Sequence, residues 1–160
     1  MKKTIISIVI FTVAIFSVNA QKISDQTIGL RLGDNSGLGA EISYQRLMGD
    51  TNRLEVDLGL RDSDGVSSYK LAANYQWVWA LSEVNEKMNW YAGFGGGLGS
   101  WKIKDLDETN TAAFASGNVG IEYNFDIPLL LSLDIRPEFG FSDAYDGLNT
   151  DIALGVRYQF

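Results

Sequence analysis

Charged side chains are the residues of this chain best suited to chemistry, since the sequence contains no histidine and no cysteine. Their absence removes the commonest general base, the thiolate nucleophile and the usual protein ligands of zinc. Eleven charged residues, six acidic and five basic, occupy alternate positions within runs whose other positions are apolar. These residues are Glu41, Glu55, Asp57, Glu122, Asp134 and Glu138, with Arg31, Arg61, Lys70, Arg136 and Arg157.

Such a set could form a catalytic carboxylate pair, line a selective water path, or build a network of ion pairs inside the fold. The near balance of the two signs favours the network, because an unpaired buried charge is costly. The glycine-rich segment 92–101 lacks the spacing of a phosphate-binding loop, and its inward glycines are expected to leave room for Tyr91 and Phe114. We therefore predict an interior polar network with no catalytic residue, cofactor or metal.

The composition narrows the class of protein further. The chain has 160 residues, 20 acidic against 13 basic, and a net charge of -7. Such a balance argues against a protein that neutralises nucleic-acid phosphates, so no nucleic-acid partner is expected. The 17 glycines, the 12% of aromatic residues and the two prolines are typical of strands and tight turns rather than a helical bundle.

The first 20 residues have the pattern of a secretory signal peptide. Lys2 and Lys3 precede an apolar run from Ile5 to Val18, and the small residue Ala20 follows at a suitable cleavage position. The apolar run would span only about 21 Å as a helix, short of the roughly 30 Å of a bilayer core. We predict a signal peptide over 1–20 and one domain over 21–160.

From residue 28 onward, apolar and polar residues alternate with a period of two, which predicts β-strands with one apolar face. Eight runs show this alternation, and none of their apolar faces carries a charge. The runs are 28–33, 38–45, 54–61, 69–79, 90–99, 113–125, 129–141 and 152–160. The sequence therefore predicts an all-β, eight-stranded, antiparallel up-and-down barrel. Pro137 lies inside one run and predicts a β-bulge, because a closed barrel offers no free edge for its missing donor.

Alternation alone does not decide whether the apolar faces look outward into lipid or inward, as in a soluble periplasmic binding barrel. The apolar faces are bulky and aromatic, whereas the polar faces are rich in glycine, as a narrow interior requires. Aromatic residues such as Trp79, Trp90 and Tyr158 gather towards one end of the runs, while Tyr69 and Phe139 lie towards the other. Aromatic girdles and an uncharged outer face are typical of a transmembrane β-barrel.

The last ten residues, DIALGVRYQF, end on an aromatic residue and carry apolar side chains at alternate positions. This segment resembles the C-terminal assembly signal of bacterial outer-membrane barrels, with Leu154, Val156, Tyr158 and Phe160 as its apolar members. The chain over 21–160 is similar in pattern to the small OmpA/OmpX-type barrels. The resemblance implies secretion to the periplasm, insertion by the barrel assembly machinery, periplasmic termini, and residence in the cell outer membrane among its lipid and lipopolysaccharide.

Barrel enzymes of this size, the lipid A acyltransferase and deacylase types, rely on a histidine that this chain lacks. We therefore expect a non-enzymatic, monomeric outer-membrane barrel of a Gram-negative envelope. Its polar interior is expected to be largely plugged, and its role to be structural or at the cell surface. The alternative is a narrow porin-like channel for small solutes.

Overall fold

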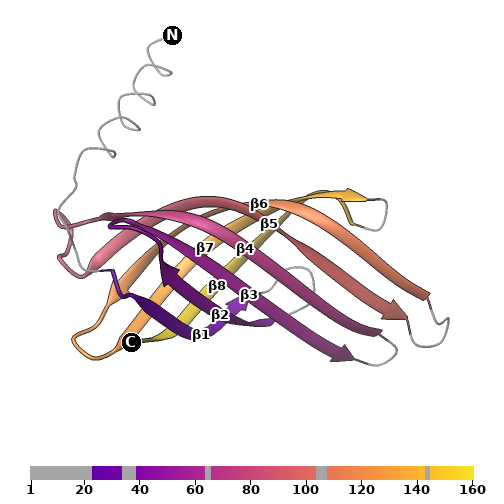
Figure 1. Ribbon diagram of the computed structural model, residues 1–160, viewed down its shortest axis with the longest axis horizontal. Helices are drawn as coiled ribbons and strands as arrows, with labels where there is room; N and C mark the ends of the chain where they lie inside the picture. The colour runs from indigo at the N-terminus through magenta and orange to yellow at the C-terminus, as the bar shows by residue number, and fades with distance from the viewer. Residues whose placement is uncertain (1–22, 34–38, 64–65, 104–107, 143–144) are drawn as a thin grey trace, which may run out of the picture.

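The computed structural model describes residues 23–33, 39–63, 66–103, 108–142 and 145–160; within these ranges the side chains of 61–63, 103 and 108 are not described. Eight antiparallel strands form a closed barrel in the order β1 to β8, which confirms the predicted fold class (Figure 1). The strands are β1 Gln26–Gly33, β2 Ala40–Leu47, β3 Asn52–Ser63, β4 Val66–Ala80, β5 Met88–Ile103, β6 Glu108–Asn124, β7 Leu129–Ser142 and β8 Tyr145–Gln159. The described residues contain no helix that is long and apolar enough to cross a membrane.

The first and last strands close the barrel. β1 pairs with β8 from Thr27 opposite Gln159 to Gly33 opposite Ala153. The backbone of Phe160 then exchanges hydrogen bonds of 3.2 and 3.0 Å with that of Gln26. We call the end where β1 begins and β8 finishes the terminal end, and the opposite one the distal end; Figure 1 shows the C-terminus at the terminal end.

Side chains alternate between the interior and the outer wall, and the polar faces point inward in all eight strands. In β5, for example, Tyr91 is fully buried whereas Phe94 is 64% exposed on the outer wall. Such a division follows from the period of two, because successive side chains of a strand point to opposite faces. The core of this molecule is therefore mainly charged and polar, and most of its large apolar residues lie on the outside.

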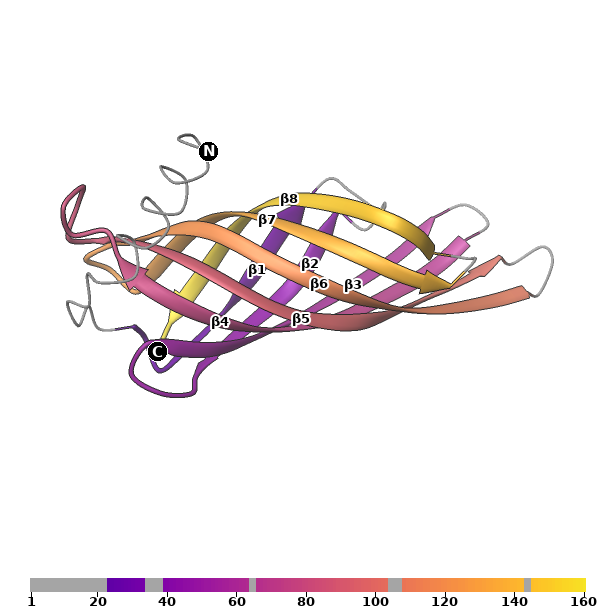
Figure 2. The ribbon, with the colours of Figure 1, turned by 90° about the horizontal axis from the view of Figure 1, so that it is seen from above.

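Most strands are longer than the alternation predicted. β5 continues to Ile103, whereas the predicted run stopped at residue 99. β6 already begins at Glu108, whereas the predicted run started at residue 113. The outward residues of the added segments are polar, among them Ser100, Lys102, Thr109 and Thr111, so the apolar alternation disappears although the backbone ladder continues. Figure 2 shows β1 and β2 as much shorter strands than β5 and β6.

The predicted bulge at Pro137 is wrong. Ser116 pairs with Glu138 and Val119 pairs with Ile135, so β6 and β7 keep one register across the proline and no extra residue is inserted. The ladder is instead interrupted opposite Pro137, where β6 carries Gly117. A Cβ atom at that glycine would lie 3.3 Å from the proline ring, so glycine provides the space that the ring uses. Because Pro137 has no backbone N–H to donate, β6 and β7 lose their backbone pairing at this position and resume it on either side.

Candidate functional site

The polar interior brings together the charged residues that the sequence pointed to. Ten of the eleven are at most 6% exposed inside the barrel: Arg31, Glu41, Glu55, Asp57, Lys70, Glu122, Asp134, Arg136, Glu138 and Arg157. The side chain of Arg61 lies outside the described residues, as does the whole of the predicted signal peptide 1–20. The described interior charges fall into two groups.

The first group surrounds Arg136 on β7. Its guanidinium bonds to Glu41 on β2 at 2.7 Å, to Asp57 on β3 at 2.8 Å and to Glu138 on its own strand at 2.9 Å. Lys70 on β4 bonds to Glu138 at 2.6 Å. One arginine thus joins carboxylates from three strands across the lumen.

Arg31 on β1 extends this group. It bonds to Asp134 at 2.6 Å and to Glu41 at 3.1 Å, and it also pairs with Asp151 on β8. Glu41 is shared by Arg31 and Arg136, so the two arginines belong to one network, which we call the Arg136 cluster. Its members are Arg31, Glu41, Asp57, Lys70, Asp134, Arg136, Glu138 and Asp151.

The second group, the Arg157 cluster, is joined mainly through Glu55. Arg157 bonds to Glu55 at 2.9 Å, and its other nitrogens reach Ser43 at 3.0 Å and Ser132 at 2.7 Å. Glu55 also accepts hydrogen bonds from Gln45 and Gln76. Gln76 in turn accepts a hydrogen bond from Arg53, which pairs with Glu122 at 2.7 Å, and Glu122 accepts a further one from Asn89.

Tyr91 bridges the two groups. The guanidinium of Arg53 lies 4.6 Å from the centre of the Tyr91 ring, and the Tyr91 hydroxyl donates to Asp134 at 3.4 Å. A Cβ atom at Gly120 would lie 2.5 Å from the Tyr91 ring, and one at Gly97 would lie as close to Phe114. The inward glycines therefore leave room for these rings, as the sequence predicted.

Sequence reasoning missed two members of the network, Arg53 and Asp151. Each lies one residue before the first apolar position of a predicted run, where the pattern had been taken to begin. Arg53 points the same way as Glu55, and Asp151 the same way as Ala153, so extending the alternation by one residue would have found both. Because one is a cation and the other an anion, their addition leaves the net charge of the interior unchanged.

The two groups differ in net charge. Among the described residues, the Arg157 cluster holds two arginines and two carboxylates, whereas the Arg136 cluster holds three cations and five carboxylates. The described part of the chain contains no group of three or more acidic side chains placed to hold a metal ion. The carboxylates are instead occupied by arginine and lysine.

Aromatic rings lie over the Arg136 cluster at the distal end. Phe114 and Tyr145 have ring centres 6.0 Å apart, and Trp101 lies 6.3 Å from Tyr145. The Tyr145 hydroxyl donates to Glu138 at 2.7 Å, and the Lys70 ammonium lies 5.1 Å from the Phe114 ring. At the terminal end, Gln159 donates to Ser24 and to Asn124, each at 2.8 Å. Side chains of different strands therefore contact one another at both ends of the barrel.

Some buried polar atoms of the described interior have no protein partner. They are Arg53 Nη2, Asp57 Oδ1, Asn74 Nδ2, Asn89 Oδ1, Asn118 Nδ2 and Ser142 Oγ. Buried polar groups are nearly always hydrogen-bonded, either to protein or to ordered water. These atoms therefore mark the positions at which internal water would bind.

The predicted assembly residues lie on the outer wall along β8 and at the residue that follows it. Leu154, Val156, Tyr158 and Phe160 are between 37% and 56% exposed, and the Tyr158 and Phe160 rings stack at 6.2 Å. Their role in assembly stays a prediction. Elsewhere at the terminal end, Trp79 stacks on Trp90 at 4.3 Å, forming part of the expected aromatic girdle.

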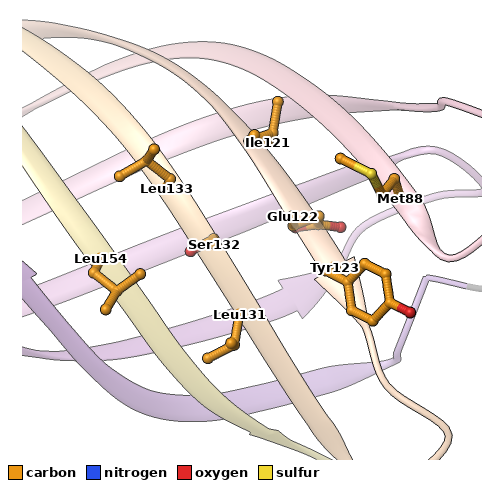
Figure 3. Close-up of a pocket in the computed structure, with 8 residues that line it drawn as sticks. All are labelled: Met88, Ile121, Glu122, Tyr123, Leu131, Ser132, Leu133 and Leu154. Carbon is orange, nitrogen blue, oxygen red and sulfur yellow. The ribbon is translucent and has the colours of Figure 1, made fainter. Parts of the chain in front are cut away.

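The outer wall also carries a shallow apolar groove of about 170 Å³ across β5 to β8. Its lining includes Ile121, Leu131, Leu133 and Leu154 (Figure 3). Glu122 and Ser132 lie between these apolar residues in sequence, but they point into the barrel and are buried there. The side chains that line the groove from the outer wall are mainly apolar, with the Met88 thioether and the Tyr123 phenol at one side.

Comparison with known proteins identifies the fold. No protein-family model matches the sequence, and no curated protein matches it. Among solved structures, the N-terminal β-barrel domain of Pseudomonas aeruginosa OprF matches with a TM-score of 0.64 at 15% identity, over 86% of this chain and 98% of that one. This is the small outer-membrane barrel fold.

Two further structures of the small outer-membrane barrel fold match nearly as well. Neisserial surface protein A has a TM-score of 0.60 at 16% identity, over 84% of this chain and 94% of its own. Ail, the attachment invasion locus protein of Yersinia pestis, has a TM-score of 0.56 at 15% identity, over 86% and 97%. A de novo designed transmembrane β-barrel matches with a TM-score of 0.58 at 15% identity, over 89% of this chain and all of that one.

Proposed function

We propose that this protein is a non-enzymatic barrel of the bacterial outer membrane, with a closed polar interior and a structural or surface role in the envelope. The outer wall supports residence in a membrane, because its exposed side chains include Leu30, Ile42, Leu133 and Ile152 at 47% exposure or more. Exposure of so much hydrocarbon in water would be unfavourable, whereas lipid accommodates it. The predicted signal peptide and the fold of the matching structures support the outer membrane as the location.

The observation that carries the closed interior is the position of Arg136. Its side chain is fully buried at the centre of the lumen and bonds to carboxylates on β2, β3 and β7. An eight-stranded barrel has an interior only wide enough for side chains to fill. Solutes passing through would have to break several buried ion pairs at once.

The same contacts argue against catalysis. Each described carboxylate of the interior is bonded to at least one arginine or lysine and is at most 6% exposed. A general base needs access to substrate within hydrogen-bond reach. The buried charges serve packing and pairing inside the wall.

A narrow cation-selective channel is the second candidate, and two observations favour it. The described interior holds two more carboxylates than cations, and several of its polar atoms lack protein partners. Water bound at those atoms would extend a polar path along the lumen. An excess of buried negative charge would then favour cations over anions.

Single-channel recording separates the two candidates. Residues 21–160, refolded and inserted in a planar bilayer, are expected to show no resolved conductance steps in potassium chloride. A variant with Phe114 and Tyr145 both replaced by glycine removes the distal rings and is also expected to show no steps, because the Arg136 ion pairs still cross the lumen. Cation-selective steps from the unaltered protein would establish the channel instead.

Location is tested separately by separating the inner and outer membranes of expressing cells on a density gradient. We expect the protein in the outer-membrane fraction, migrating faster on gels before boiling than after, because a closed barrel keeps its backbone hydrogen bonds paired in detergent. Recovery in a detergent-free periplasmic extract would show the soluble class of barrel instead. Monomeric state and insertion by the barrel assembly machinery are part of the same proposal.

A further inference from the structure

The Arg136 cluster carries more negative charge than its own cations balance. Among the described side chains it holds five carboxylates against three cations, whereas the Arg157 cluster holds two of each. Of the strand residues whose side chains are not described, only Arg61 is cationic. Even with that arginine counted, the cluster keeps one carboxylate more than it has cations. A buried negative charge without a counter-charge is strongly unfavourable.

One carboxylate oxygen of this cluster is buried without a partner. Asp57 is 1% exposed, and its Oδ2 accepts a hydrogen bond of 2.8 Å from Arg136. Its Oδ1 is the only buried carboxylate oxygen of the described residues that has no hydrogen-bond partner. Buried polar groups are nearly always paired, either with protein or with a bound species. This oxygen therefore marks a place where something outside the chain is bound.

The neighbours of Asp57 show what the bound species must supply. The inward residues opposite it are Ser43 on β2 and Ala72 on β4. Ser43 is bonded to Arg157 at 3.0 Å, and alanine has no polar side-chain atom. A water molecule at Oδ1 would provide a hydrogen bond, but it would not provide the positive charge that the cluster lacks. A cation provides both a contact to the oxygen and the missing charge.

The distal edge of the cluster is the part that water contacts. The side chains of Glu41 and Lys70 are each 7% exposed, whereas those of Asp57 and Arg136 are not exposed at all. Glu41 and Lys70 lie in one row across β2, β3 and β4, and Asp57 lies one row deeper, about 7 Å along β3. A small ion that arrives from the distal end therefore meets Glu41 before it reaches Asp57.

The available ligands favour a monovalent ion. Calcium and magnesium sites combine several oxygen ligands, often from more than one carboxylate. Among the described residues, no group of three or more acidic side chains is placed to hold a metal ion. Asp57 offers a single free oxygen, so water must complete the coordination. Potassium and sodium are compatible with such a site, and acidic side chains inside a protein lumen attract them.

We infer that the lumen holds one inorganic monovalent cation, potassium or sodium, against Oδ1 of Asp57. The ion contacts the carboxylate oxygen that Arg136 does not hold, and it supplies positive charge to the Arg136 cluster. A resident ion is compatible with a closed lumen, so it adds a bound component to the barrel and not a transport activity. Single-channel recording and membrane fractionation test the proposed function separately from the ion.

Urea unfolding of the refolded barrel, residues 21–160, in lipid vesicles measures ion binding. Potassium chloride replaces N-methylglucamine chloride at constant pH and ionic strength, because this organic cation is too large for an eight-stranded interior that side chains already fill. One bound ion predicts that the unfolding equilibrium constant falls about tenfold for each tenfold rise in potassium once the site is mostly occupied. An equilibrium constant that ignores potassium would overturn the inference, and a proton would then be the balancing charge.

Two variants and a second metal sharpen this measurement. Asp57→Asn removes the charge that holds the ion and is expected to abolish the dependence on potassium. Asp50→Asn removes the same charge from an exposed turn at the terminal end and is expected to keep that dependence. Equal dependence in the two variants would overturn the site. Magnesium chloride at the same ionic strength is expected to have little effect, and an effect equal to that of potassium would overturn the monovalent assignment.

Anomalous diffraction from crystals of the unaltered barrel soaked in rubidium chloride locates the ion without any substitution. This measurement decides the proposal even if Asp57→Asn fails to fold. Rubidium resembles potassium, so one peak is expected inside the lumen beside Asp57. Peaks only at exposed carboxylates would represent an adventitious ion only and would overturn the site, as would the absence of any peak in the lumen.

Discussion

The two faces of β7 show how differently the interior and the outer wall of this barrel are built. Inward, Asp134, Arg136 and Glu138 each bond to named partners on other strands. Outward, Leu133 and Ile135 are 49% and 47% exposed and lie beside other apolar residues of β6 and β8. Inside, geometry selects particular partners for each charged group. Outside, only the polarity and the area of the side chains matter. Substitutions on the two faces should therefore destabilise the barrel for different reasons.

The largest effect is expected from Arg136→Leu, which leaves Glu41, Asp57 and Glu138 short of their shared cation. Loss of one partner of a buried ion pair costs about 3 to 5 kcal/mol. Urea unfolding of the refolded barrel in lipid vesicles, followed by tryptophan fluorescence, measures the loss. The adjacent outward change Ile135→Leu should alter the free energy of unfolding by less than about 1 kcal/mol. Equal losses at 135 and 136 would contradict the division into faces.

The next largest effect is expected from Leu133→Arg, which places a charge on the outer wall. An arginine near the middle of a bilayer destabilises a transmembrane barrel by about 2 to 4 kcal/mol. Leu133→Met keeps the side chain apolar and should be nearly neutral. The same unfolding experiment in vesicles measures both. An outer wall that tolerated arginine as well as methionine would not be facing lipid.

A smaller effect on stability is expected from Phe160→Ala at the seam between β8 and β1. Loss of one interfacial ring removes at most about 1.5 to 3 kcal/mol of burial. The amount of folded barrel in cell membranes should fall far more steeply, because the resemblance to the assembly signal implies that the machinery reads a terminal aromatic residue. Phe160→Tyr keeps an aromatic ring and should restore assembly. Equal membrane levels of all three chains would show that Phe160 is only a strand end.

The smallest effect is expected outside both faces, at the terminal-end turn. Lys87 pairs with Asp126 there, and this hydrogen bond raises the pKa of Lys87. A raised pKa in the folded state contributes stability below the ordinary lysine pKa, and that contribution disappears as the pH rises through the folded value. The small difference in unfolding free energy between the unaltered barrel and Lys87→Met should therefore vanish at strongly alkaline pH. A difference that grew with pH would contradict the pairing.

Much of the site could be read from the order of residues, and the failures have physical reasons. The inward direction of Glu55 and Asp57 follows from their place in an alternating run. Arg53 was missed because the predicted run was started at its first apolar residue. The distal extensions of β5 and β6 were missed because their outward residues are polar, so that the apolar alternation stops before the strands do. Pro137 was expected to force a bulge, but Gly117 on the neighbouring strand offered a solution that no reading of a single strand reveals.

The sequence by itself determined the period, the number of strands and the inward face of ten of the predicted charges, because side chains of a strand alternate in any sheet. Only the tertiary structure decided which charges meet. Arg31 and Asp134 are separated by 103 residues and lie on strands that are not neighbours, yet they bond across the lumen at 2.6 Å. Closure of β8 onto β1 and the register of every pair set those distances, and neither is encoded in any single run of residues.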